Sequence, residues 1–269
     1  MKIFISADIE GCAGWAFTEE GHIGEHGYER MAQQMTREVV TACEAAYAAG
    51  ATEVIVKDGH GNGGNIDPLQ MPPYVTLIRG KSGHPYNMMY GLDVSFDAVA
   101  YIGYHAPAGN THFNGSHTST GNSLYIKLNG QSFSEFMLNT YTAATFGVPV
   151  IFISGDKAIC ELAQELVPSI VANPTKFGVG AATHCYAVDT VISGIHTGIK
   201  AGMENVKNNK KGNTLVLPKS FTYEVTFKDW HRAYKMAFYP GMKQVDDFTL
   251  QLQTTSWLEV ATAHSFVVY

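Results

Sequence analysis

Cysteine and long apolar runs are both scarce in this sequence of 269 residues. Its four cysteines are far apart and form no Cys-X-X-Cys pair: Cys12, Cys43, Cys160 and Cys185. Cysteine usage of this kind argues against a disulfide framework and favours a reducing compartment. No apolar run approaches the ~18 residues that span a bilayer. The stretch at residues 3–9 is broken by Ser6 and Asp8, which argues against a signal peptide. We therefore expect a soluble, cytoplasmic protein with no membrane partner.

Positive charge is also limited, because 18 lysines and arginines stand against 24 aspartates and glutamates, giving a formal net charge of −6. Nucleic-acid-binding proteins usually concentrate Lys and Arg on one face. The one basic cluster here, Lys207, Lys210 and Lys211, is short and typical of the solvated end of a helix. Nucleic acid is therefore not an expected partner.

Strand-like and helix-like segments alternate along residues 1–212. The pattern of apolar residues predicts strands at 2–7, 53–57, 74–78, 98–104 and 148–153, and helices at 28–49, 135–146, 154–166 and 184–208. Asn129-Gly130, between strand-like residues 123–128 and 131–133, predicts a hairpin with a type I′ turn. The alternation predicts an α/β fold with a mostly parallel central sheet flanked by helices.

The pattern changes after Gly212. Residues 222–227 and 247–254 have the composition of strands, and a short helical pattern lies between them at 230–238. We therefore expect two units: an α/β metallohydrolase domain at 1–212 and a small C-terminal α+β subdomain at 213–269, packed against the first.

Potential metal ligands follow three of the predicted strands. Asp8 and Glu10 follow the first, His60 the second and His105 the fourth. Functional groups of open α/β sheets gather beyond the carboxyl ends of the strands, and Asp8 and Glu10 project to the same side of an extended chain. Taken singly, each residue is more typical of a turn, a helix cap or an ordinary histidine. Their coincidence at three strand ends favours a metal site, but the pattern alone leaves both interpretations open.

Five short motifs occur in order: Asp8-Ile-Glu-Gly, Val56-Lys-Asp-Gly-His60, Gly103-Tyr-His105-Ala, Ser116-His117, and Glu135 with Leu138-Asn139. In order and spacing this set resembles the DppA-type D-aminopeptidases, a family of binuclear zinc aminopeptidases. The resemblance implies that two Zn²⁺ ions per chain, replaceable by Mn²⁺ or Co²⁺, are bound by Asp8, Glu10, His60, His105 and Glu135, with Asp8 bridging. Two divalent cations and three carboxylates leave a charge of +1, which one hydroxide cancels.

The resemblance also implies an activity. The chain would release N-terminal residues, D-amino acids in particular, from short peptides or amino-acid amides through a water activated by two metals. His117 would be the catalytic residue outside the metal shell, protonating the departing amine or stabilising the oxyanion. Family members form ring-shaped homo-oligomers, so a decamer of two stacked pentamers, with active sites facing an internal chamber, is the assembly implied here.

Two other functions remain open from the residues themselves. One is another two-metal hydrolase, such as a phosphoesterase, since the same ligands serve both chemistries. Phosphate substrates usually call for Arg or Lys near the metals, and the motifs contain only Lys57, whose side chain should point away from that of Asp58. The other is a non-catalytic metal- or peptide-binding protein, which would have no use for His117.

Two further features near the motifs have alternative interpretations. His112 could take the catalytic role assigned to His117. The glycine-rich residues 59–65 could either form a sharp turn, which we favour, or direct backbone amides at a substrate carboxylate. The remaining loop histidines are more typical of surface positions than of a pocket entrance: His22, His26 and His84.

Overall fold

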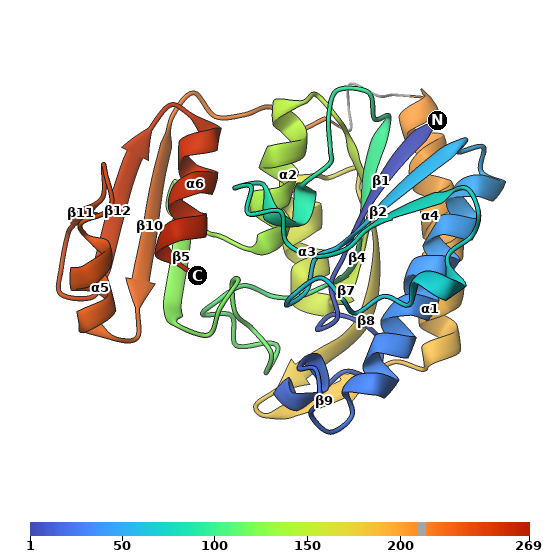
Figure 1. The fold of residues 1–269 in the computed structure, drawn as a ribbon, viewed down its shortest axis with the longest axis horizontal. Helices are drawn as coiled ribbons and strands as arrows, with labels where there is room; N and C mark the ends of the chain where they lie inside the picture. Colours follow the sequence, from blue (N-terminus) through green and yellow to red (C-terminus); the bar gives the residue numbers. More distant parts are fainter. Residues whose placement is uncertain (209–213) are drawn as a thin grey trace.

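The computed structural model describes residues 1–208 and 214–269, which form two β-sheets with helices around and between them (Figure 1). The larger sheet has the strand order β3-β2-β1-β4-β7-β8-β9 and is parallel except for the β8–β9 pair. Its strands are β1 (Lys2–Ala7), β2 (Glu53–Asp58), β3 (Val75–Ile78), β4 (Ala98–Tyr104), β7 (Val150–Asp156), β8 (Val171–Val179) and β9 (Ala182–Cys185). The predicted α/β fold with a mostly parallel sheet is confirmed.

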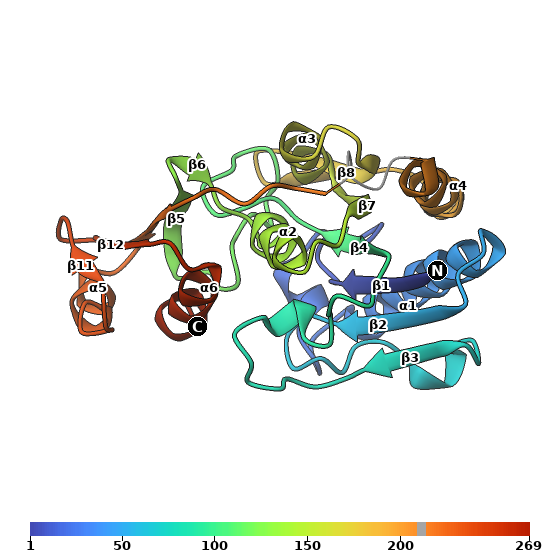
Figure 2. The ribbon, with the colours of Figure 1, turned by 90° about the horizontal axis from the view of Figure 1, so that it is seen from above.

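Helices cover both faces of this sheet (Figure 2). The helices α1 (Tyr28–Ala48) and α4 (Val188–Asn208) pack together on one face, and α2 (Glu135–Thr145) and α3 (Lys157–Leu166) lie on the other. Because strands β1, β4 and β7 are buried between the two helical layers, their sequences are mostly apolar rather than alternating. Three short 3₁₀ helices occur in the connections: η1 (Thr18–Gly21), η2 (Pro68–Gln70) and η3 (Asn87–Met89).

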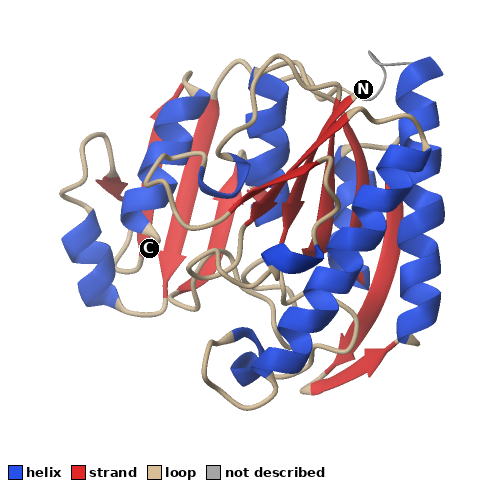
Figure 3. Ribbon diagram, turned by 45° about the vertical axis from the view of Figure 1, so that its right-hand side comes forward, coloured by secondary structure: helices blue, strands red, loops and turns tan. Residues whose placement is uncertain are grey.

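The second sheet is antiparallel, with the order β11-β12-β10-β5-β6, and stands beside the first (Figure 3). Its strands are β5 (Ser123–Leu128), β6 (Gln131–Ser132), β10 (Phe221–Phe227), β11 (Lys243–Gln244) and β12 (Thr249–Thr254), accompanied by the helices α5 (Trp230–Met236) and α6 (Trp257–Val267). Asn129 and Gly130 have positive φ angles, 51° and 79°, which confirms the predicted hairpin.

Helix α2 lies between the two sheets and contributes to both cores. Phe136 packs in the core of the larger sheet, and Met137, Leu138 and Tyr141 pack in that of the second. The Ser134 hydroxyl accepts a hydrogen bond from the N–H of Met137 and so defines where the helix begins. The first residue of α2, Glu135, is thereby held at the junction of the sheets.

The expected division into 1–212 and 213–269 stays a prediction. Its boundary near Asn213, like Lys210 and Lys211, lies outside the described residues. The second sheet takes the β5–β6 hairpin from the middle of the chain, so the segments that share this core do not follow one another in the sequence. Among the described helices, none combines the length and the apolar character needed to cross a membrane.

Candidate metal centre

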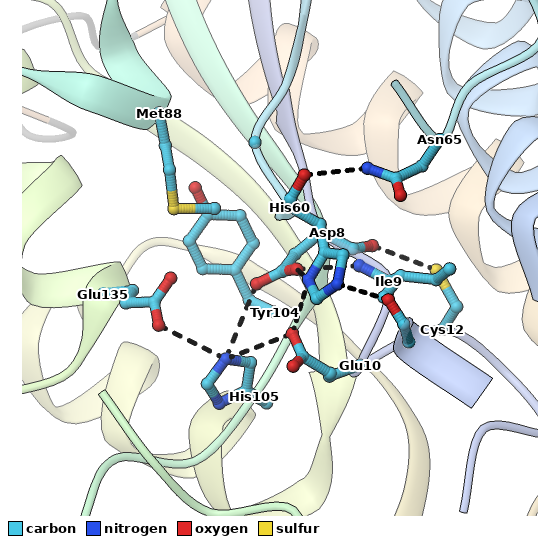
Figure 4. A network of polar contacts seen from close by, with 12 residues as sticks. Asp8, Ile9, Glu10, Cys12, His60, Asn65, Met88, Tyr104, His105 and Glu135 are labelled. Carbon is cyan, nitrogen blue, oxygen red and sulfur yellow. Dashed lines mark hydrogen bonds and ion pairs between the residues drawn. The ribbon is translucent and has the colours of Figure 1, made fainter. Parts of the chain in front are cut away.

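The carboxyl ends of three adjacent parallel strands, β2, β1 and β4, bring together four of the five predicted ligands, and the start of α2 adds Glu135 (Figure 4). His60 Nδ1 lies 3.1 Å from Asp8 Oδ1 and 3.0 Å from Glu10 Oε2. His105 Nε2 lies 3.5 Å from Asp8 Oδ2 and 3.4 Å from Glu135 Oε1. All five residues predicted as ligands therefore surround one small volume, although their role as ligands stays a prediction.

Among the described residues, potential ligand atoms form three overlapping groups, each with atoms within 4.8 Å of one another. The groups are Asp8–Glu10–His60, Asp8–His105–Glu135 and Glu10–His105–His117. The first two share Asp8, as they would if its carboxylate bridged two ions. The third includes His117, whose Nε2 is 3.5 Å from Glu10 Oε1 and whose ring stacks on that of His105 at 4.2 Å.

Each of the three histidines has one ring nitrogen against a backbone carbonyl oxygen. These contacts are His60 Nε2 to Gly21 at 2.8 Å, His105 Nδ1 to Ala106 at 3.1 Å and His117 Nδ1 to Gly115 at 2.9 Å. A carbonyl oxygen only accepts, so the nitrogen beside it carries the hydrogen and the other ring nitrogen is directed at the carboxylates. Histidines that bind metals are usually oriented by a partner of this kind.

The electrostatics of the cluster fit a cation. Burial alone would lower the pKa of His105, but Glu135 and the neighbouring carboxylates raise it to about 10. Burial acts on His60 in the same way, and Glu10 and Asp8 raise its pKa well above the usual value. Without a metal ion, protons on His60 and His105 balance the negative charge of the buried carboxylates. A metal ion must displace those protons to bind.

An orphaned polar atom also fits a metal. His105 Nε2 is buried and has no hydrogen-bond partner of acceptable geometry within residues 1–208 and 214–269. Buried polar atoms are rarely left unsatisfied unless water or an ion completes them. Imidazole nitrogens and carboxylate oxygens are ligands that zinc takes in catalytic sites, so the residues present fit the predicted cofactor.

Asp58 has a structural role. Its carboxylate accepts hydrogen bonds from Asn65 N at 2.6 Å, Asn65 Nδ2 at 2.7 Å and Ile66 N at 2.8 Å. The loop that it holds has positive φ angles at Gly61 (52°) and Gly63 (74°), which supports our interpretation of residues 59–65 as a sharp turn. Asn65 Nδ2 also donates to the carbonyl oxygen of His60, fixing the backbone of a predicted ligand.

A buried lysine that the sequence analysis missed supports the segment carrying Glu10. Lys176, on β8, is fully buried, and its ammonium donates hydrogen bonds to the carbonyl oxygens of Glu10, Cys12 (2.9 Å) and Trp15 (3.0 Å). The sequence analysis predicts no strand at 171–179, where the structure has β8, with Pro174 in the middle of it. The expected helix starting at His184 begins only at Val188, because β9 occupies residues 182–185.

Ser119 supports Glu135 from the other side of the site. Its N–H donates to Glu135 Oε1 at 2.7 Å, and its hydroxyl lies 2.8 Å from Nε2 of His264, on α6. Ser119 has a φ of 63°, a left-handed conformation that is uncommon outside glycine and often found at functional sites. Sequence analysis offered no signal for this residue.

The cluster forms part of a pocket of about 740 Å³. Its lining includes Asp8, Glu10, Glu135, His60 and His117, and also four residues that no motif indicated: His22, Lys81, Lys228 and Tyr269. His22 is exposed, as expected, and also lines the pocket. His26, His84 and His112 are not part of this lining and are exposed.

Comparisons with known proteins agree on one family. A family model described as D-aminopeptidase matches residues 1–266. The D-aminopeptidase of Bacillus subtilis (strain 168) is 28% identical over 265 residues, which are 98% of this chain and 95% of that protein. A solved structure described as the Zn-dependent D-aminopeptidase DppA from Bacillus subtilis, a self-compartmentalizing protease, matches with a TM-score of 0.92 and 27% identity, over 100% of this chain and 97% of that one.

Proposed function

The chain belongs to the D-aminopeptidase family and is a metal-dependent aminopeptidase, and we propose that it releases N-terminal D-amino acids from short peptides or amino-acid amides with two zinc ions. The observation that carries the proposal is the pair of potential ligand groups that share Asp8. Asp8, Glu10 and His60 would hold one ion, and Asp8, His105 and Glu135 the other. Mn²⁺ and Co²⁺ are expected to substitute for zinc in this set of ligands.

Two zinc ions held by these residues would lower the pKa of a bound water and polarise the carbonyl group to be attacked. The buried carboxylates of this chain would hold the ions in place, and the pocket that they line admits the substrate. The free amino group of the substrate is directed to this acidic end of the pocket.

His117 is the residue we assign to proton transfer. Its Nδ1 is held by the carbonyl oxygen of Gly115, which orients Nε2 toward Glu10. The side chain is 24% exposed and lines the pocket, so Nε2 can reach a substrate. Nε2 would take the proton released by the attacking water and deliver it to the departing amine.

The phosphoesterase alternative was disfavoured by the scarcity of basic residues in the motifs. Lys81 and Lys228 nevertheless line the pocket, so that scarcity is no argument against an anionic substrate. The family match decides between the two hydrolases instead.

A panel of substrates tests the proposal. The zinc-loaded protein is incubated with D- and L-alanine amide, D- and L-alanyl dipeptides, an N-acetylated D-alanyl dipeptide and p-nitrophenyl phosphate. We expect hydrolysis of the D substrates that have a free amino group and none of the acetylated peptide or the phosphate ester. Faster hydrolysis of p-nitrophenyl phosphate than of every aminoacyl substrate would overturn the proposal.

We further propose that the chain assembles into a ring-shaped homo-oligomer, a decamer by the family resemblance, and acts in the cytoplasm. Support for assembly comes from the description of the solved relative as a self-compartmentalizing protease. Support for a reducing compartment comes from four free cysteines, three of them buried. Light scattering that finds a stable and active monomer would contradict the assembly.

A further inference from the structure

We propose that Lys81 and Lys228 bind the free C-terminal carboxylate of the substrate, so that the pocket recognises a short, unblocked peptide at both of its ends. This inference rests on the proposed aminopeptidase function and names the substrate class of the same site. It makes di- and tripeptides with a free carboxylate better substrates than their amides.

The two lysines that line the pocket come from different sheets. Lys81 follows β3 of the larger sheet, and Lys228 follows β10 of the second sheet. Among the described residues that line the pocket they are the only lysines or arginines, and Asp8, Glu10 and Glu135 line the same pocket. The pocket therefore offers both positive and negative groups to one ligand.

The ammonium group of Lys81 is held in place. Its Nζ donates to the carbonyl oxygen of Gly59 at 2.5 Å and to Asn87 Oδ1 at 3.1 Å. An ammonium has three donors, so a third remains for a ligand. Asn87 in turn donates through Nδ2 to the phenol oxygen of Tyr269 at 2.7 Å, and its φ of 38° is rare for a residue with a side chain. Strained positions of this kind cluster where a binding site is organised in advance.

The backbone of Lys228 is held by a hydrogen bond, and its side chain is available to bind a ligand. Its N–H donates to the carbonyl oxygen of Asn122 at 3.0 Å, directly after the last residue of β10. The residue is exposed, and its ammonium makes no hydrogen bond or ion pair within the part of the chain that the structure describes. It can therefore turn toward a ligand without breaking a contact described here.

A simpler role for the lysines would be to neutralise the acidic cluster. The charges argue against it, because two divalent ions, three carboxylates and one hydroxide already balance to zero. Two further ammonium groups would give the pocket a charge of +2, which favours an anion there. The peptide carboxylate is an anion that an aminopeptidase substrate itself supplies.

Matched substrates test the inference. D-Alanyl-glycine and its C-terminal amide differ in the carboxylate and share the amino group and the scissile bond. In Lys81→Met and Lys228→Met we expect KM for D-alanyl-glycine to rise about tenfold, the usual worth of a charge-assisted hydrogen bond at a partly exposed site. KM for the amide should change less than twofold in both variants. Lys127→Met, an exposed lysine on β5 outside the pocket, is the control and should change neither.

The outcomes are separable. Equal changes for peptide and amide, or no change for either, would overturn the carboxylate assignment while leaving the aminopeptidase function intact. Wild-type protein that hydrolyses neither substrate would overturn the proposed function and this inference together. If Lys81→Met loses its fold through the contact with Gly59, Lys228→Met still decides, because its ammonium supports no described contact.

Discussion

The hydroxyl oxygen of Ser119 lies 2.8 Å from Nε2 of His264, and this contact links the second sheet to the metal centre. The other ring nitrogen of His264 lies 2.7 Å from the buried phenol oxygen of Tyr223. A phenol needs an acceptor for its hydrogen, so Tyr223 donates to Nδ1, and the Nε2–H donates to Ser119. The hydroxyl hydrogen of Ser119 is then available to an acceptor in the pocket.

This arrangement requires a neutral His264 and predicts acid sensitivity. Burial lowers the pKa of His264 to about 4, against about 6.5 in an unfolded chain. Between these values the unfolded state binds the proton and the native state does not, so stability falls as the pH drops from 6.5 toward 4. The full pKa shift corresponds to a loss of ~3 kcal/mol in the free energy of unfolding.

When the pH is lowered from 7 to 4.5, we therefore expect the free energy of unfolding to fall less in His264→Gln than in the wild-type protein. The measurement is urea unfolding of the metal-free proteins at both pH values, so that loss of zinc in acid does not contribute. The difference between the two proteins should be ~2 kcal/mol, since most of the pKa shift lies in this window. Parallel losses in the two proteins would show that His264 is not buried in its neutral form.

Lys176 is expected to stabilise the segment that carries Glu10. In Lys176→Met the side chain keeps its approximate volume, but three carbonyl oxygens lose their donor. Unsatisfied buried acceptors cost ~1–3 kcal/mol each, partly offset by removing a buried charge, so we expect a net loss of ~3 kcal/mol. Urea unfolding of the metal-free protein measures the stability, and competition with a chelator measures zinc affinity, which should also fall.

The matched control for this variant is Lys157→Met, which removes an exposed lysine paired with Glu161 at 3.7 Å. Exposed pairs of this kind contribute at most ~1 kcal/mol. A Lys176→Met protein as stable as this control, with unchanged zinc affinity, would show that the ammonium does not hold the Glu10 segment.

Local patterns in the sequence indicate part of the ligand cluster. Asp8, His60 and His105 each come shortly after a strand whose apolar run is visible in the sequence, and parallel strands place such ends side by side. Glu135 begins a helix instead of following a strand, so only the family resemblance indicates it. The α/β pattern predicts parallel strands but not their order, which the structure supplies.

The supporting residues depend on pairings between distant segments. Lys176 reaches Glu10 because β8 lies beside β7 in the sheet, and Ser119 reaches His264 because α6 packs near the β5 region. Lys228 lines the pocket because β10 pairs with β5. Local periodicity does not encode such partners, so neither these residues nor the composition of the second sheet could be inferred from the sequence.

Removing a predicted ligand should affect the metal before the fold. His60→Ala is expected to lower the zinc content below two ions per chain and to reduce activity by orders of magnitude. His60 is only 12% exposed, but among the described residues the hydrogen bonds of its side chain go only to the cluster and to the carbonyl of Gly21, so circular dichroism should be unchanged. His22→Ala is the control, since His22 lines the same pocket but belongs to no ligand group among the described residues. An unchanged zinc content in His60→Ala would remove it from the ligand set.

His117 separates binding from catalysis, because its Nε2 also falls within a potential ligand group with Glu10 and His105. If it transfers protons, His117→Ala should keep both zinc ions and lose ~10²–10⁴-fold in rate. The Asp8-sharing groups already supply ligands for two ions, and a further protein ligand would displace the attacking water. His112→Ala, at an exposed position outside the pocket, should retain nearly full activity. Zinc analysis and kinetics of the two variants decide together. Loss of zinc in His117→Ala would make His117 a metal ligand. An inactive His112→Ala beside an active His117→Ala would assign proton transfer to His112 instead.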